Sequence, residues 1–127
     1  MDVLLIEDDL DDIELLQETL KVNGVRYNLT TLKDGSEAVE FIRNPPGVPD
    51  IIILDYKLPD NKNGIEAAVK IFTTYPSAAI LIVTAYDTVK EDVLRHSIFE
   101  GKRFAILLKP IKLARLENAI FDILKSK

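Results

Sequence analysis

Residues 50–60 read Asp50-Ile51-Ile52-Ile53-Leu54-Asp55-Tyr56-Lys57-Leu58-Pro59-Asp60. The apolar run from Ile51 to Leu54 ends abruptly in an acid, and a Pro-Asp turn follows. A strand that is apolar on both faces is typical of the middle of a parallel sheet covered by helices. Asp55, its last residue, is therefore expected at the carboxyl edge of the sheet, where open α/β sheets place ligands.

Three other apolar runs end in polar residues in the same way. Residues 3–6 lead into Glu7-Asp8-Asp9, residues 79–83 into Thr84-Ala85, and residues 104–108 into Lys109-Pro110. Because parallel strands end at one edge of their sheet, we expect acids, a hydroxyl and an amine to converge there.

Strand-like and helix-like segments alternate along the whole chain. We expect strands at about residues 2–6, 26–32, 51–54, 79–83 and 104–108. We expect five helices: one at about 10–22, one that begins after Ser36 as its cap, one that ends at Tyr75, one at about 88–100 that Gly101 stops, and one at about 113–125. Strands that alternate with helices of about ten to fifteen residues indicate a doubly wound α/β fold. The prediction is one (βα)5 domain over residues 1–127, with a five-stranded parallel sheet.

The composition agrees with one globular domain. The chain of 127 residues is long enough to bury a core, and with no cysteine it can have neither disulfides nor thiolate metal sites. No apolar run is long enough to span a bilayer, and the first strand begins too early for a signal peptide. We expect a cytoplasmic protein without a membrane association.

Charge is distributed unevenly between the two halves of the chain. Residues 1–60 carry 14 acidic and 5 basic side chains, whereas residues 61–127 carry 7 and 11. The net charge of −5 argues against direct nucleic-acid binding, which favours a basic face. The pattern predicts an acidic pocket and, elsewhere, a mildly basic surface.

The acids at the predicted edge indicate metal and phosphoryl chemistry. Glu7, Asp8 and Asp55 would repel one another and raise each other's pKa unless a cation lay between them. Mg²⁺ suits such a site, since it takes one or two carboxylates and several waters. Lys109 and Thr84 supply a point charge and a hydroxyl for phosphoryl oxygens. Asp55 would then be a nucleophile that forms an aspartyl-phosphate.

In these residues and their positions after the strands, the chain resembles a receiver domain of the response regulators of two-component signalling. The resemblance covers essentially all of the chain and is to the stand-alone, chemotaxis-regulator type. The resemblance implies the flavodoxin-like strand order 2-1-3-4-5 and a cis Lys109-Pro110 bond. It implies that Asp55 accepts phosphate from a histidine kinase or phosphotransfer protein, and that Thr84 and Lys109 bind the phosphoryl oxygens. Mg²⁺ would be held by Glu7, Asp8, Asp55 and the backbone carbonyl of Lys57.

The chain departs from the family pattern at three places. The switch aromatic of the family, three residues before the lysine, falls at Ile106. The stretch 59–64 is one residue longer than is common. We expect no output domain, so that the signal would leave through the surface, to an output protein that the sequence does not identify. That surface is predicted on the fourth helix, the fifth strand and the fifth helix, with positive charge from Lys90, Arg95, Lys102, Lys112 and Arg115. Helix 10–22 is the expected docking element for the kinase.

Several of these residues, and the chain as a whole, also allow other interpretations. Asp9, Asp11 and Asp12 are assigned to a solvated helix start, and His96, the single histidine, is assigned no ligand role. Lys57 and Tyr86 either control water access or are plain loop residues. A phosphate-independent interaction scaffold is the main alternative function. A phosphatase of the haloacid-dehalogenase type would need a second aspartate at the position of Lys57. A flavodoxin or a dinucleotide-binding protein would need a phosphate-binding loop that this chain does not contain. We expect a signalling switch, not an enzyme, that is monomeric or weakly dimeric.

Overall fold

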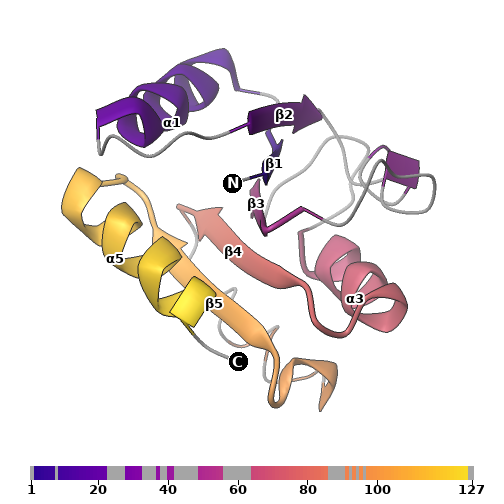
Figure 1. The fold of residues 1–127 in the computed structure, drawn as a ribbon. Coiled ribbons are helices and arrows are strands. Elements are labelled where there is room, and N and C mark those ends of the chain that lie inside the picture. Colours follow the sequence, from indigo (N-terminus) through magenta and orange to yellow (C-terminus); the bar gives the residue numbers. More distant parts are fainter. Residues whose placement is uncertain are drawn as a thin grey trace.

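The computed structural model describes residues 2–7, 9–22, 28–32, 37, 40–41, 49–55, 64–85, 91, 93, 95 and 97–125. Within these ranges an α-helix follows each of the strands at 2–6, 51–55 and 103–108, as predicted (Figure 1). The elements are β1 (Asp2–Ile6), α1 (Leu10–Val22), β2 (Asn28–Leu32), β3 (Ile51–Asp55), α3 (Gly64–Thr74), β4 (Ala79–Thr84), the 3₁₀ turn η1 (Ser97–Phe99), β5 (Arg103–Leu108) and α5 (Leu113–Lys125).

The strands form one parallel sheet in the order β2-β1-β3-β4-β5, which confirms the predicted topology. β3 lies at the centre, between β1 and β4. Ile6 is paired with Leu54 in the β1–β3 register, and Thr84 with Leu108 in the β4–β5 register. The carboxyl ends of these four strands therefore lie at the same edge of the sheet.

Helices cover both faces of the sheet, with α1 and α5 on one side and α3 on the other (Figure 1). Alternate residues of each strand enter the two layers. In β3, Ile52 and Leu54 pack on the α3 side, whereas Ile51 and Ile53 pack on the α1 and α5 side. Burial on both faces explains why the strand sequences are apolar runs without polar alternation.

The predicted fourth helix ends differently from expectation. The structure describes residues 91, 93, 95 and 97–100 of it, and Ser97–Phe99 form a 3₁₀ turn in place of α-helix. The amide of Glu100 donates to the carbonyl of Ser97, and that of Lys102 to the carbonyl of Phe99. Such i to i+3 bonds tighten a last turn. Gly101 follows at φ 72°, as expected of a residue that stops a helix. The helix expected after Ser36 lies mostly outside the described residues.

The side chain of Arg103, in β5, forms hydrogen bonds with the last residues of α5. Its guanidinium donates to the carbonyls of Ile123 at 3.3 Å and Leu124 at 3.2 Å, and to that of Ser77 at 3.5 Å. The last carbonyls of a helix lack partners within the helix, and a cation there is favourable.

Removal of this guanidinium should weaken the fold. We expect Arg103→Met to lower the free energy of unfolding by about 1 to 2 kcal/mol, because the helix carbonyls lose charged donors. Urea unfolding measures the loss. Arg115→Met, at an exposed position of the same helix, is the control and should cost less than about 0.5 kcal/mol. Equal losses in both variants would contradict the capping role.

Candidate functional site

Four predicted site residues meet at the carboxyl edge of the sheet. Glu7 follows β1, Asp55 ends β3, Thr84 ends β4 and Lys109 follows β5. Pairing of Ile6 with Leu54 brings Glu7 beside Asp55, and pairing of Thr84 with Leu108 brings Lys109 beside Thr84. Asp8 and Lys57, the other two members of the predicted site, lie outside the described residues, as do His96 and Tyr86.

Lys109 joins the two carboxylates. Its Nζ lies 3.3 Å from Oδ2 of Asp55 and 3.8 Å from Oε2 of Glu7. Its backbone amide donates to the carbonyl of Thr84 at 2.7 Å, and its bond to Pro110 is cis, as the family resemblance implied. The backbone of Lys109 is therefore held at the end of β4, and its side-chain amine lies beside both acids.

Glu7 is a buried acid, with 3% of its surface exposed. Burial, followed by the negative charge of Asp55, raises the pKa of Glu7 from 4.5 to about 7. A hydrogen bond from the Asp9 amide, at 3.1 Å from Oε1, and the charge of Lys109 lower that pKa but do not cancel the rise. The pKa increase predicted from repulsion between the acids is thus found at Glu7, where burial is the larger cause and the charge of Asp55 the second.

The raised pKa predicts how stability depends on pH. Between pH 4.5 and about 7 the folded protein keeps a proton on Glu7 that the unfolded chain has lost. In the absence of divalent cations, the free energy of unfolding should therefore fall as pH rises through this range, by up to about 3 kcal/mol.

Urea unfolding in a chelator, at pH values from about 5 to about 8, measures this dependence. The Glu7→Gln variant lacks the titrating group, so its stability should change less over the range and exceed that of the native chain at the upper end. A native profile parallel to that of Glu7→Gln would contradict the raised pKa.

The donor set fits a hard divalent cation. Glu7 and Asp55 present carboxylate oxygens side by side, one buried and the other 13% exposed. Oxygen ligands of this kind suit Mg²⁺, which commonly takes one or two carboxylates and keeps waters. Among the described residues no group of three His, Cys, Asp or Glu side chains could hold a metal ion. The third predicted carboxylate, Asp8, is not among them.

Thr84 and Asp9 complete the described surroundings. Thr84 is fully buried at the end of β4, and the small, exposed Ala85 follows it. Asp9 precedes α1 and caps it: its side chain accepts from the backbone amide of Asp11 at 2.9 Å, and its carbonyl accepts from the amide of Ile13. The assignment of Asp9 to a helix start is confirmed. Its amide also anchors Glu7, a role that no side-chain pattern in the sequence reveals.

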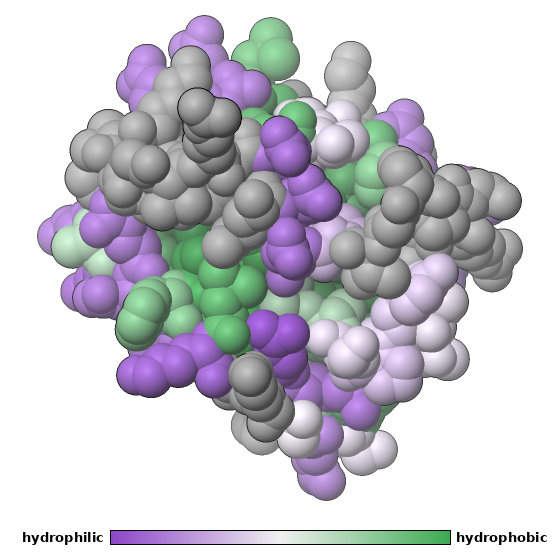
Figure 2. Space-filling model, viewed as in Figure 1, coloured by the Kyte–Doolittle hydropathy of each residue, from purple (hydrophilic) through white to green (hydrophobic). Residues whose placement is uncertain are grey.

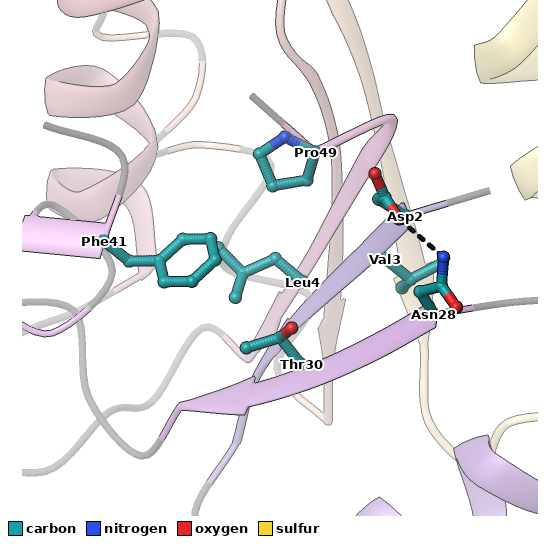
Figure 3. A pocket seen from close by; sticks show the side chains of 7 residues that line it. All are labelled: Asp2, Val3, Leu4, Asn28, Thr30, Phe41 and Pro49. Carbon is teal, nitrogen blue, oxygen red and sulfur yellow. Dashed lines mark hydrogen bonds between the residues drawn. The ribbon is translucent and has the colours of Figure 1, made fainter. Parts of the chain in front are cut away.

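A separate cavity lies at the opposite, amino edge of the sheet (Figure 3). Its volume is about 210 Å³, and it is lined by Asp2, Val3, Leu4, Asn28, Thr30, Phe41 and Pro49. The side-chain amide of Asn28 donates to Asp2 Oδ1 at 3.0 Å across the rim of the cavity, and Phe41 faces Leu4. Because Glu7, Asp55, Thr84 and Lys109 do not line it, this cavity is distinct from the candidate site.

The comparisons with known proteins agree with this fold. The family described as response regulator receiver domain matches residues 3–121. A cyclic di-GMP phosphodiesterase of Thermotoga maritima is 31% identical over 127 residues, which is all of this chain and 32% of that protein. The chain belongs to the response regulator receiver domain family, whose members are signalling switches. It spans about a third of that relative's length.

Solved receiver domains have the same architecture. The receiver domain of the sensor histidine kinase PA1611 from Pseudomonas aeruginosa, solved with a magnesium ion in its active-site cleft, superposes with a TM-score of 0.78 at 25% identity. The alignment covers 98% of each chain. The phosphorylated cyanobacterial phytochrome response regulator RcpA matches with a TM-score of 0.75 at 25% identity, over 94% of this chain and 87% of that one. No helix among the described residues is long and apolar enough to cross a membrane.

Proposed function

We propose that the chain is a phosphoacceptor switch in which Asp55 receives a phosphoryl group from the phosphohistidine of a histidine kinase or phosphotransfer protein. One observation carries the proposal: the Asp55 carboxylate lies at the carboxyl edge of the sheet, 3.3 Å from the Lys109 amine and beside the buried Glu7. This arrangement places a carboxylate nucleophile, carboxylate oxygens for a metal ion and a cation for phosphate at one edge of the sheet.

The proposed reaction is a simple displacement. A carboxylate oxygen of Asp55 bonds to phosphorus as the phosphorus–nitrogen bond of the donor breaks, and the electron pair of that bond stays on the histidine ring. Glu7, Asp8, Asp55 and the Lys57 carbonyl would hold Mg²⁺, which when bound supplies neutralisation of charge on the phosphoryl group. Lys109 would exchange its contact with Asp55 for one with a phosphoryl oxygen.

Phosphorylation would then be read at the end of the sheet formed by β4 and β5. Thr84 and Lys109 are joined through a 2.7 Å backbone hydrogen bond, so a phosphoryl group held by both side chains would draw two adjoining segments together. Beyond them β5 is an edge strand with mostly half-buried side chains, and the chain segments before and after it carry the described cations Arg95, Lys102, Lys112 and Arg115. An output protein would bind there.

A second candidate function is a scaffold that binds its partner without phosphate. Ile106 favours it, because this half-buried aliphatic residue stands where the family has its switch aromatic. The intact set of Glu7, Asp55, Thr84 and Lys109 favours the phosphoacceptor.

Phosphorylation with a small donor separates the two functions. We expect intact mass spectrometry after incubation with acetyl phosphate and Mg²⁺ to show one added phosphoryl group on the native chain. The group should be absent when a chelator replaces Mg²⁺, and absent in Asp55→Asn. An unmodified native chain, even after rapid quenching, would reject the phosphoacceptor and leave the scaffold.

A further inference from the structure

The cavity at the amino edge of the sheet, which we call the amino-edge cavity, has an apolar end and a polar end (Figure 3). Over the face of the molecule drawn in Figure 2, groups of hydrophobic side chains lie among hydrophilic ones. In the cavity the two kinds are separated. The ring of Phe41 lies against Leu4 on one side, and Asp2 lies beside its partner Asn28 on the other. A hollow with apolar walls and a few convergent polar groups is typical of a small-molecule site.

The apolar end is built from residues that the core holds in place. Leu4 is fully buried in β1, and Pro49 is buried shortly before β3. Phe41 is half-buried and packs against the hydrophobic core on the α3 side of the sheet. None of these three side chains carries a polar group, and an aromatic ring favours offset or edge-on contact with another ring. This end therefore suits a small aromatic group.

The polar end is acidic. The side-chain amide of Asn28 donates to Oδ1 of Asp2 at 3.0 Å, and the backbone amide of Asp2 donates to Oδ2 of Asp50 at 2.7 Å. Two carboxylates therefore lie near this end, and none of the described lining residues is basic. The surplus of acids over residues 1–60, 14 against 5 basic side chains, acts in the same direction. A cation is favoured here and an anion is repelled.

The volume limits the size of a ligand. An apolar cavity of about 150 Å³ takes up benzene in another protein, whereas sites for drug-sized molecules begin at about 300 Å³. The amino-edge cavity, at about 210 Å³, lies between the two. It therefore has room for one six-membered ring with a short arm, but not for a ligand of several rings.

We propose that the amino-edge cavity binds a small arylalkylamine, with its ring at the apolar end and its ammonium group on the Asp2 carboxylate. The hydrogen bond from Asn28 orients that carboxylate, and a charge-assisted bond to it would fix the position of the amine. Thr30 adds an exposed hydroxyl to the lining. The proposal is independent of phosphoryl transfer, because the cavity and Asp55 lie at opposite edges of the sheet.

Titration of the native chain with phenethylamine, followed by the amide NMR spectrum, is the test. We expect saturable shifts at the amides of residues 3–4 and 28–30. For a ligand of about nine non-hydrogen atoms the expected dissociation constant is about 1 mM. Phenethyl alcohol, which is neutral and nearly the same size, should bind at least about threefold more weakly. The anion phenylpropionate should not shift these amides.

Two variants test the two ends of the cavity. Asp2→Asn keeps an oxygen that can accept from Asn28 but loses the charge, so it should weaken phenethylamine binding at least about threefold and leave phenethyl alcohol unaffected. Asp122→Asn, which changes an exposed acid of α5, is the matched control and should bind as the native chain does. Thr30→Phe should fill the cavity and abolish binding of both probes. An aromatic residue suits a strand, so circular dichroism should be unchanged.

A third variant separates this cavity from the acids of the candidate site. Asp55→Asn should bind phenethylamine with the native dissociation constant. Loss of binding in that variant would place the amine at the candidate site and overturn the proposal. So would shifts that do not saturate, equal binding of phenethylamine and phenethyl alcohol, native affinity in Asp2→Asn, or undiminished binding by a folded Thr30→Phe.

Discussion

Replacement of Lys109 by alanine is expected to slow phosphoryl transfer to Asp55 by at least about 100-fold, the usual cost of removing one preorganised charge-stabilising donor. Its ammonium lies within 4 Å of both described carboxylates, so the variant loses the cation at the point where negative charge accumulates. The initial rate of acetyl phosphate incorporation in saturating Mg²⁺, followed by intact mass, measures the effect.

Lys112→Ala is the matched control for this variant, since Lys112 is an exposed lysine three residues further along the chain. Its rate should equal that of the native chain. Incorporation by Lys109→Ala at the native rate would show that the amine takes no part in transfer. The variant retains the backbone hydrogen bond from residue 109 to the Thr84 carbonyl, so we expect it to remain folded.

Replacement of Phe72 by alanine is expected to cause the largest loss of stability, about 3 to 5 kcal/mol. Phe72 is 1% exposed and makes edge-on contacts with Phe99 at 5.7 Å and with Phe104 at 6.4 Å between ring centroids. Truncation leaves a cavity where α3, η1 and β5 meet. Urea unfolding measures the loss, with Phe121→Ala as an exposed control that should cost less than about 1 kcal/mol. Similar losses would contradict this account of the core.

The strands and the terminal helices could be predicted because local pattern and burial agree there. Residues 51–54 are apolar throughout, and a central parallel strand buries both faces, so pattern and environment coincide. The helix predicted over about 113–125 was found at Leu113–Lys125, since its apolar spacing matches one buried face. The order of the strands came from the family resemblance, because local pattern carries no information about neighbours across a sheet.

The 3₁₀ turn at Ser97–Phe99 could not be predicted because tertiary contacts decide it. Phe99 is drawn toward Phe104, with ring centroids 4.7 Å apart, and toward Phe72. These partners lie in other elements, and sequence spacing gives no measure of their distance. The role of Arg103 was missed for the same reason, because the carbonyls that it caps come about twenty residues later.

The residue types of the site could be predicted from the sequence, but the burial of Glu7 and the contact of Lys109 with both acids could not. The position of Glu7, Asp55, Thr84 and Lys109 after four apolar runs was sufficient to place them at one edge. The near-complete burial of Glu7 depends on the strands around it, and the hydrogen bond from its backbone amide to the Leu32 carbonyl depends on the β1–β2 register. The contact of Lys109 with both acids was also unforeseen, since the sequence suggested a role toward phosphate alone.

The most direct test of the central claim is to locate the phosphoryl group. The native chain is treated with acetyl phosphate and Mg²⁺, its acyl phosphate is reduced with borohydride, and the modified residue is identified by peptide sequencing. The account predicts reduction at Asp55 alone, dependent on Mg²⁺. Reduction at any other acid, or phosphorylation that proceeds equally without Mg²⁺, would contradict it.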